Sequence, residues 1–139
     1  MTADVVIVSY RTPELTCRAA RSALDAGAAR VVVVDNASRD QTIAALRRIV
    51  DNRIQVIESE GNQGFGSAAN TGARSIGPGT LVFLNSDAWI GAQALQLLAI
   101  ELDRWNGRAI VGPRLISEDG SVQRSAGLLP RPSDLALRA

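Results

Sequence analysis

Four short stretches of the sequence gather polar side chains that could bind a charged ligand: residues 9–12, 35–38, 61–70 and 85–87. In the last stretch, Asp87 could present oxygen ligands to a hard divalent cation, Mg²⁺ or Mn²⁺, which would bridge to the diphosphate of a ligand. The alternative for Asp87 is that it caps the turn that follows, as aspartate often does.

Asp35 could bind an aromatic base. Its carboxylate could accept the ring N–H of uracil or thymine, while Tyr10 packs on the ring. The alternative is a turn in which Asn36 and Ser38 satisfy local backbone groups. Ser38 and Asp40 together favour a turn and the start of a helix.

The glycine-rich stretch at residues 61–66 lets backbone approach a ligand closely. Asn70, in the helix expected after it, either contacts the ligand or ties that helix to the loop. Other ligand classes are excluded. A dinucleotide site needs a G-x-G-x-x-G turn after the first strand, and a phosphate loop needs a lysine. The first turn has no glycine, and the chain has neither lysine nor histidine.

Alternating strands and helices must position these residues. β-branched runs predict strands at residues 4–9, 30–34, 54–57, 80–84 and 109–111. Helices are expected at residues 13–26, with Thr12 as the capping hydroxyl, at about 40–50, from about 66 to 75, and at 93–105. A hairpin is expected over residues 114–124. This order predicts an α/β fold with a doubly wound, mostly parallel sheet, which binds ligands at the carboxyl ends of its strands.

Composition narrows the class of protein. The chain is 46% hydrophobic and 21% charged, which is typical of a globular domain, and its net charge of +1 argues against nucleic acid as a partner. A single cysteine, Cys17, suits a reducing compartment. No apolar run approaches the roughly 20 residues that span a bilayer, so no transmembrane segment is expected, and nothing in the sequence fixes the oligomeric state.

The residues at 5–10, 32–40, 62–72 and 84–87 resemble the family 2 glycosyltransferases with the GT-A fold. Residues 112–115 and 119–125 are further similar to the rhamnosyltransferase-type members. The resemblance implies an inverting transfer of a sugar from a dTDP- or UDP-activated donor. The acceptor would be a glycan or lipid-linked glycan in cell-wall or surface polysaccharide synthesis, in a bacterial cytoplasm or at the inner face of the plasma membrane.

The resemblance also assigns roles to residues. Tyr10 and Asp35 would hold the base, Asn85 would contact the ribose, and Asp87 alone would ligate a divalent cation, Mn²⁺ or Mg²⁺. The full nucleotide-binding set predicted from the four stretches is Ser9, Tyr10, Arg11, Asp35, Asn62, Gly64, Asn70, Asn85 and Ser86.

No residue of this chain is assigned as the catalytic base, because the family's base lies in an acceptor-binding half that we expect beyond residue 139. We therefore expect a nucleotide-sugar-binding domain over residues 1–127 and a tail, residues 128–139, leading into the acceptor segment. Alone, the chain is expected to be inactive. The alternative function is a binding module that holds a nucleotide sugar without transferring it. A nucleotidyltransferase would need a glycine- and lysine-bearing loop after the first strand, which the residues at 10–13 do not supply.

Overall fold

Four parallel strands form the central sheet of the computed structural model, which describes residues 2–125. They are β1 (Asp4–Ser9), β2 (Arg30–Asp35), β3 (Ile54–Glu58) and β4 (Leu81–Asn85), in the spatial order β3-β2-β1-β4. Val5 and Val6 of β1 and the four valines of β2 are almost fully buried, as expected for the central strands of a sheet that is covered on both faces. The predicted parallel sheet is confirmed.

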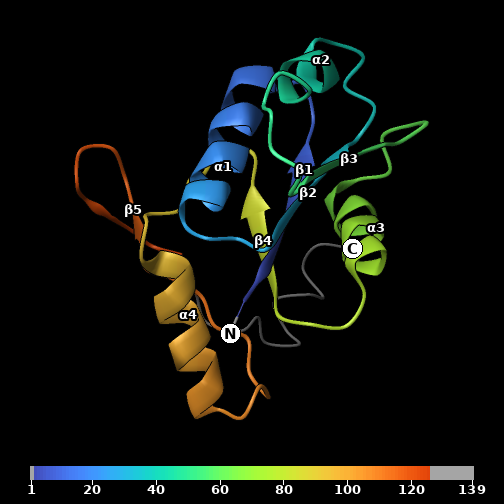
Figure 1. Cartoon of the computed structure of the whole chain (residues 1–139). Helices are drawn as coiled ribbons and strands as arrows, with labels where there is room; N and C mark the ends of the chain where they lie inside the picture. Colours follow the sequence, from blue (N-terminus) through green and yellow to red (C-terminus); the bar gives the residue numbers. More distant parts are fainter. Residues whose placement is uncertain (1, 126–139) are drawn as a thin grey trace, which may run out of the picture.

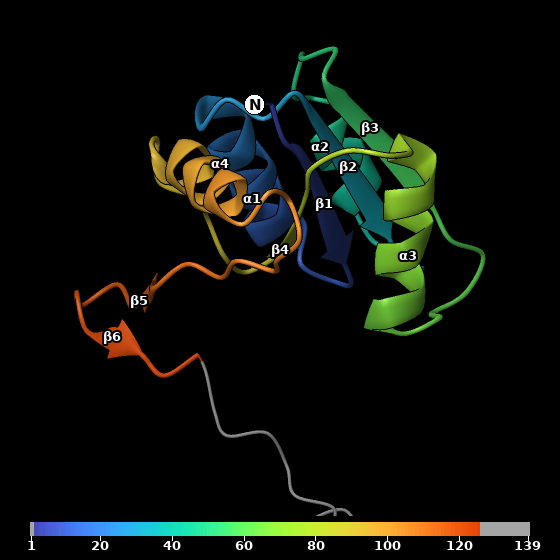
Figure 2. The same cartoon turned by 90° about the horizontal axis from the view of Figure 1, so that it is seen from below.

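Helices cover both faces of this sheet (Figure 1). On one face lie α1 (Pro13–Asp25) and α2 (Thr42–Leu46), with α4 (Ala94–Arg104) beside α1, while α3 (Phe65–Ile76) lies on the other face (Figure 2). Successive β1 side chains alternate between the two cores: Val5 and Ile7 pack on the α1 side, and Val6 on the α3 side. The approach of α3 is close, because a Cβ at Gly72 would lie 2.5 Å from Cγ1 of Val6.

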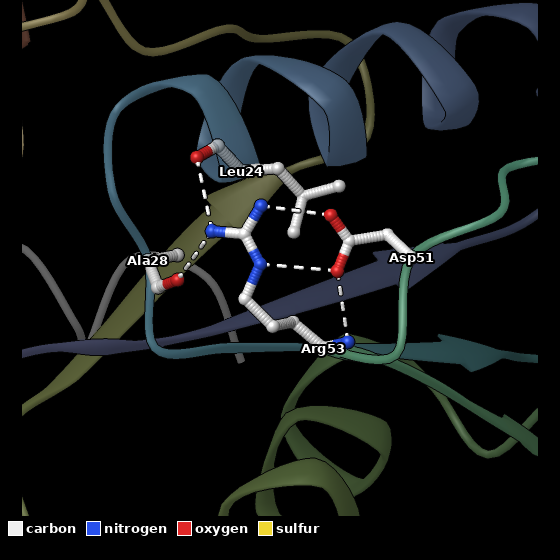
Figure 3. A network of polar contacts seen from close by, with 4 residues as sticks. All are labelled: Leu24, Ala28, Asp51 and Arg53. Carbon is white, nitrogen blue, oxygen red and sulfur yellow. Dashed lines mark hydrogen bonds and ion pairs between the residues drawn. The ribbon is translucent and has the colours of Figure 1, made fainter.

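At the amino ends of the strands, Arg53 ties three segments together (Figure 3). Its Nε and Nη2 donate to the carboxylate of Asp51 at 3.0 and 2.7 Å, and its Nη1 donates to the carbonyls of Leu24 and Ala28 at 3.4 and 3.3 Å. The guanidinium thereby joins the chain entering β3 to the end of α1 and the loop before β2. This network fixes the edge of the sheet opposite the predicted site.

Three local expectations are wrong. The second helix ends at Leu46 rather than near residue 50, because the N–H groups of Arg48 and Ile49 bond to carbonyls three residues back, at 3.2 and 2.9 Å. Val50, where the expected helix was to end, is 99% exposed. Thr12 precedes α1 but makes no side-chain cap bond. Residues 109–111 form no strand, since no strand among residues 2–125 pairs with them.

The expected hairpin is confirmed as β5 (Leu115–Ile116) and β6 (Val122–Gln123), which stand away from the sheet (Figure 2). The backbone N–H of Ser117 donates to the carbonyl of Ser121 at 2.8 Å and closes it. Among the helices of residues 2–125, none has the length and apolar character to cross a membrane. The predicted tail at 128–139 lies outside the described residues.

Candidate functional site

The strand register brings three of the predicted stretches to one edge of the sheet. Ser9, the last residue of β1, pairs with Asp35 at the end of β2, and its neighbour Val8 pairs with Asn85 at the end of β4. Because β1 lies between β2 and β4, the loops that follow Asp35 and Asn85 flank the loop that follows Ser9. Asp35 and the turn carrying Asp87 therefore share this edge, one on each side of β1.

Asp35 is 2% exposed, and its carboxylate faces its own loop. Oδ2 accepts the backbone N–H of Ser38 at 3.2 Å, and Oδ1 accepts a short hydrogen bond from the Ser38 hydroxyl. The Ser38 oxygen in turn accepts the backbone N–H of Arg11 at 2.9 Å. Asp35 thus fixes the loop after β2 and, through Ser38, the loop after β1, which is the local role that the sequence left open.

Left-handed backbone is concentrated in these two loops. Arg11, Ala37 and Arg39 have φ values of 57°, 62° and 53°, a region that costs side-chain-bearing residues free energy and that often marks functional sites. Tyr10 is 40% exposed, and the guanidinium carbon of Arg11 lies 5.1 Å from its ring centroid. The edge therefore presents an accessible aromatic ring beside a cation.

Asn36 links this edge to the glycine-rich loop. It is 3% exposed; its Nδ2 donates to Oδ1 of Asn62 at 3.0 Å, and its Oδ1 accepts the backbone N–H of Gln63 at 2.9 Å. Oδ1 of Asn62 also accepts the backbone N–H of Gly64 at 3.0 Å. These bonds hold the loop against the end of β2. Asn70 is exposed, more than one turn along α3, and its side chain makes no hydrogen bond within the described residues.

The turn after β4 is closed by backbone, since the N–H of Ala88 donates to the carbonyl of Asn85 at 3.1 Å. Asp87 is exposed, and its carboxylate has neither a hydrogen bond nor an ion pair with any residue between 2 and 125. The structure therefore does not show the capping bond that was the alternative for Asp87. Its carboxylate is open to a ligand.

Similarity to known proteins matches this geometry. The family model described as Glycosyl transferase family 2 matches residues 4–136. The chain belongs to this glycosyltransferase family. A curated relative, the succinoglycan biosynthesis protein ExoO of Rhizobium meliloti (strain 1021), is 30% identical over 139 residues. The alignment covers 96% of this chain and 40% of ExoO, so the chain spans well under half the length of that relative.

Solved structures of glycosyltransferases share the fold. S. aureus TarS 1-349, in complex with UDP, superposes with a TM-score of 0.66 at 20% identity, over 87% of this chain and 43% of the TarS 1-349 chain. The mannosyltransferase PcManGT of Pyrobaculum calidifontis, in complex with GDP-Man and Mn²⁺, superposes with a TM-score of 0.60 at 25% identity, over 71% of this chain and 31% of PcManGT. The predicted GT-A fold is confirmed.

A divalent cation needs few protein ligands where a bound diphosphate supplies the others. Residues 2–125 contain no group of three or more Asp, Glu, Cys or His side chains that could hold a metal alone. Mg²⁺ typically binds one or two carboxylates together with substrate phosphates and water. Asp87, an exposed hard-oxygen ligand at the carboxyl edge of the sheet, fits that pattern.

Some residues at this edge were missed by the sequence analysis. A hollow of about 310 Å³ lies at the ends of β2 and β3, lined by Ala37, Arg39, Glu58, Ser59 and Glu60. Glu58 is the last residue of β3. Polar residues at strand ends indicated Asp35 and Asn85, and the same criterion applies to Glu58. A second hollow, of about 400 Å³, is lined by residues of α1 and by Trp89. The smaller hollow lies beside Asp35, because Glu58, which lines it, pairs with Asp35 between β2 and β3.

Proposed function

We propose that this family 2 glycosyltransferase binds a dTDP- or UDP-activated sugar at the carboxyl edge of its sheet and serves in an inverting transfer. The observation that carries the proposal is the placement of Asp35 and the turn holding Asp87 on either side of β1. That placement suits a ligand with a base at one end and a charged diphosphate at the other. Ligands of doubly wound sheets bind at this edge.

The base side consists of Tyr10, Arg11 and Asp35. Tyr10 offers an exposed ring on which a pyrimidine can stack. Asp35 can accept a ring N–H only through lone pairs that Ser38 leaves unused, so a base must approach through the loop at residues 36–39. The adjoining hollow beside Arg39 gives that approach room.

The diphosphate side consists of the turn at residues 85–87. Asn85 is exposed and would contact a ribose hydroxyl. Asp87 would ligate Mn²⁺ or Mg²⁺, which offsets the charge of the diphosphate when bound. The Mn²⁺ present with GDP-Man in the PcManGT structure supports a divalent cation. The loop with Asn62 and Gly64, and further along α3 Asn70, would border the nucleotide.

Ser9 is not accessible to a ligand. It is fully buried, and its hydroxyl lies 2.7 Å from that of Thr16 in α1. We propose that Ser9 supports the loop after β1 from within rather than touching the nucleotide. Ser86 is half-buried beside Thr12 and lies between Asn85 and Asp87.

The acceptor is proposed to be a glycan or lipid-linked glycan of a cell-wall or surface polysaccharide, in the cytoplasm or at the inner face of the plasma membrane. The name of the relative ExoO, a succinoglycan biosynthesis protein, supports polysaccharide synthesis. Rhamnose is the proposed sugar, because residues 112–115 and 119–125 resemble the rhamnosyltransferase-type members. Inverting transfer needs a carboxylate that deprotonates the acceptor hydroxyl, and we propose that the 139 residues alone bind the donor without transferring its sugar.

A thermal-shift panel of dTDP, UDP, GDP and ADP, with manganese or with chelator, tests donor binding. A ligand that binds only the folded state at a hundred times its Kd stabilises that state by about 2.7 kcal/mol, which raises the Tm by several degrees. We expect the pyrimidine diphosphates to raise the Tm most, and only with manganese. No shift with any nucleotide would contradict the proposal. Release or transfer of the sugar from a UDP- or dTDP-sugar incubated with this chain would contradict the binding-only part.

A further inference from the structure

Thr12 precedes α1 but serves another purpose than capping it. Its hydroxyl makes no bond to the N–H groups of the first helical turn. Instead its Oγ1 donates to Oγ of Ser86 at 3.1 Å, across 74 residues of sequence. Pro13 follows Thr12 and disfavours a helical backbone there, which fits the Thr12 φ of −135°. The hydroxyl is thus held between the loop after β1 and the turn after β4.

Two buried hydroxyls continue this hydrogen bond into the protein. Oγ1 of Thr12 lies 3.2 Å from that of Thr16, and Oγ1 of Thr16 lies 2.7 Å from Oγ of Ser9. Ser9 and Thr16 are both 0% exposed, so neither can exchange its partner for water.

Each of these hydroxyls has one hydrogen to donate and two lone pairs. Since the hydrogen of Thr12 goes to Ser86, Thr16 must donate to Thr12. Ser9 must then donate to Thr16. The chain of donors runs from the buried end of β1 outward to Ser86.

Ser86 is therefore left with its own hydrogen to donate. No carbonyl or side chain between residues 2 and 125 accepts that hydrogen. Ser86 is half-buried in the turn between the exposed Asn85 and Asp87. Because Ser86 accepts from Thr12, its own hydrogen is free to be donated to a ligand. Its partner must be an oxygen with a free lone pair.

We propose that Thr12 is a positioning residue of the donor site: it holds Ser86 as an acceptor, so that Ser86 donates to an oxygen of the bound nucleotide diphosphate. The inference rests on the proposed function, because it requires a nucleotide diphosphate at this edge. Thr12 itself does not touch the ligand. Its effect on binding passes entirely through Ser86.

A double-mutant cycle measured by calorimetry tests this inference. The 139-residue chain is titrated with UDP and with dTDP in the presence of manganese, as wild type, Thr12→Val, Ser86→Ala and the double variant. Loss of one hydrogen bond corresponds to about a 3- to 10-fold weaker Kd. We expect that loss in each single variant and no further loss in the double variant. Thr12→Ser, which keeps the hydroxyl, is expected to bind like wild type.

Ser22→Ala is the matched control. Ser22 is a residue of α1 whose hydroxyl also bonds to the segment after β4, since its Oγ accepts the N–H of Ile90 at 3.1 Å. We expect this variant to have a lower Tm and an unchanged Kd. If Thr12→Val does not fold, Thr12→Ala takes its place in the cycle.

The outcomes separate the inference from the proposed function. If wild type binds neither nucleotide, the proposed function is wrong and the inference falls with it. If wild type binds but Thr12→Val binds equally well, the positioning role alone is wrong. It is also wrong if Thr12→Val weakens binding as much in the Ser86→Ala background as in wild type. Weakening that disappears in that background supports it.

Discussion

Nδ2 of Asn36 lies 3.0 Å from Oδ1 of Asn62, and this contact joins the end of β2 to the glycine-rich loop before α3. Asn36 is 3% exposed, and its Oδ1 also accepts the N–H of Gln63. One buried amide thus satisfies two groups of a loop that is otherwise exposed. The position of the loop beside the site depends on this side chain.

Asn36→Ala is expected to lower both stability and nucleotide affinity. The substitution leaves the N–H of Gln63 without a partner and removes one of the two donors to Oδ1 of Asn62. An unsatisfied group costs about 1–3 kcal/mol when it is buried, and less here, where the loop reaches water. Urea unfolding and calorimetry with UDP and manganese measure the two effects. Asn52→Ala, at an exposed amide before β3, should change neither. An Asn36→Ala variant with wild-type affinity would show that the loop is held by other means.

Gly64→Ala should destabilise the fold and weaken nucleotide binding. Gly64 has φ 77° and ψ 165°, a conformation essentially restricted to glycine, and a side chain there costs about 1–3 kcal/mol. Gly77, at the other end of α3, has φ 85° and ψ −164°, so Gly77→Ala carries the same backbone penalty away from the site. Calorimetry should find weaker binding only in Gly64→Ala. Equal affinities in the two variants would remove the loop from the site.

Asp40 gives the stability a defined pH dependence. The hydroxyl and backbone N–H of Thr42 donate to its carboxylate at 2.6 and 2.8 Å, and they hold the pKa of Asp40 below its ordinary value. Because the folded-state pKa is lowered, the stabilisation is present above the unfolded pKa of about 3.9 and is lost as the pH falls through the folded value.

Asp40→Asn keeps a side-chain acceptor but removes the titrating charge. The Tm of this variant should therefore fall less than that of wild type between about pH 5 and about pH 3. Thermal unfolding followed by circular dichroism at these two pH values measures the difference. An identical fall in the two proteins would show that the Thr42 contacts do not favour the charged form.

The sequence predicted the sheet well because buried parallel strands read as continuous β-branched runs. The strands at residues 4–9 and 30–34 are confirmed almost to the residue. The predicted strand at 109–111 failed for a tertiary reason, since an apolar run becomes a strand only where a partner strand is available. Ile110 is fully exposed instead.

The candidate site was predicted as a set of loops but not as a set of contacts. Strand ends indicated where Asp35 and Asp87 would lie, because the ends of parallel strands share one edge. The sequence did not reveal that Ser38 donates hydrogen bonds to the carboxylate of Asp35, or that Thr12 donates to Ser86. Both interactions depend on the conformation of the loops. Thr12 was read as a helix cap, which its position before Pro13 favours.

Replacing Asp87 tests the proposed donor site most directly. Calorimetry of UDP and dTDP binding, with manganese and with chelator, is compared for wild type, Asp87→Ala and Asp103→Ala, the last removing an exposed acid of α4. We predict that manganese strengthens binding to wild type and to Asp103→Ala, and that Asp87→Ala binds as weakly with manganese as with chelator. A full manganese effect in Asp87→Ala would contradict the proposed site.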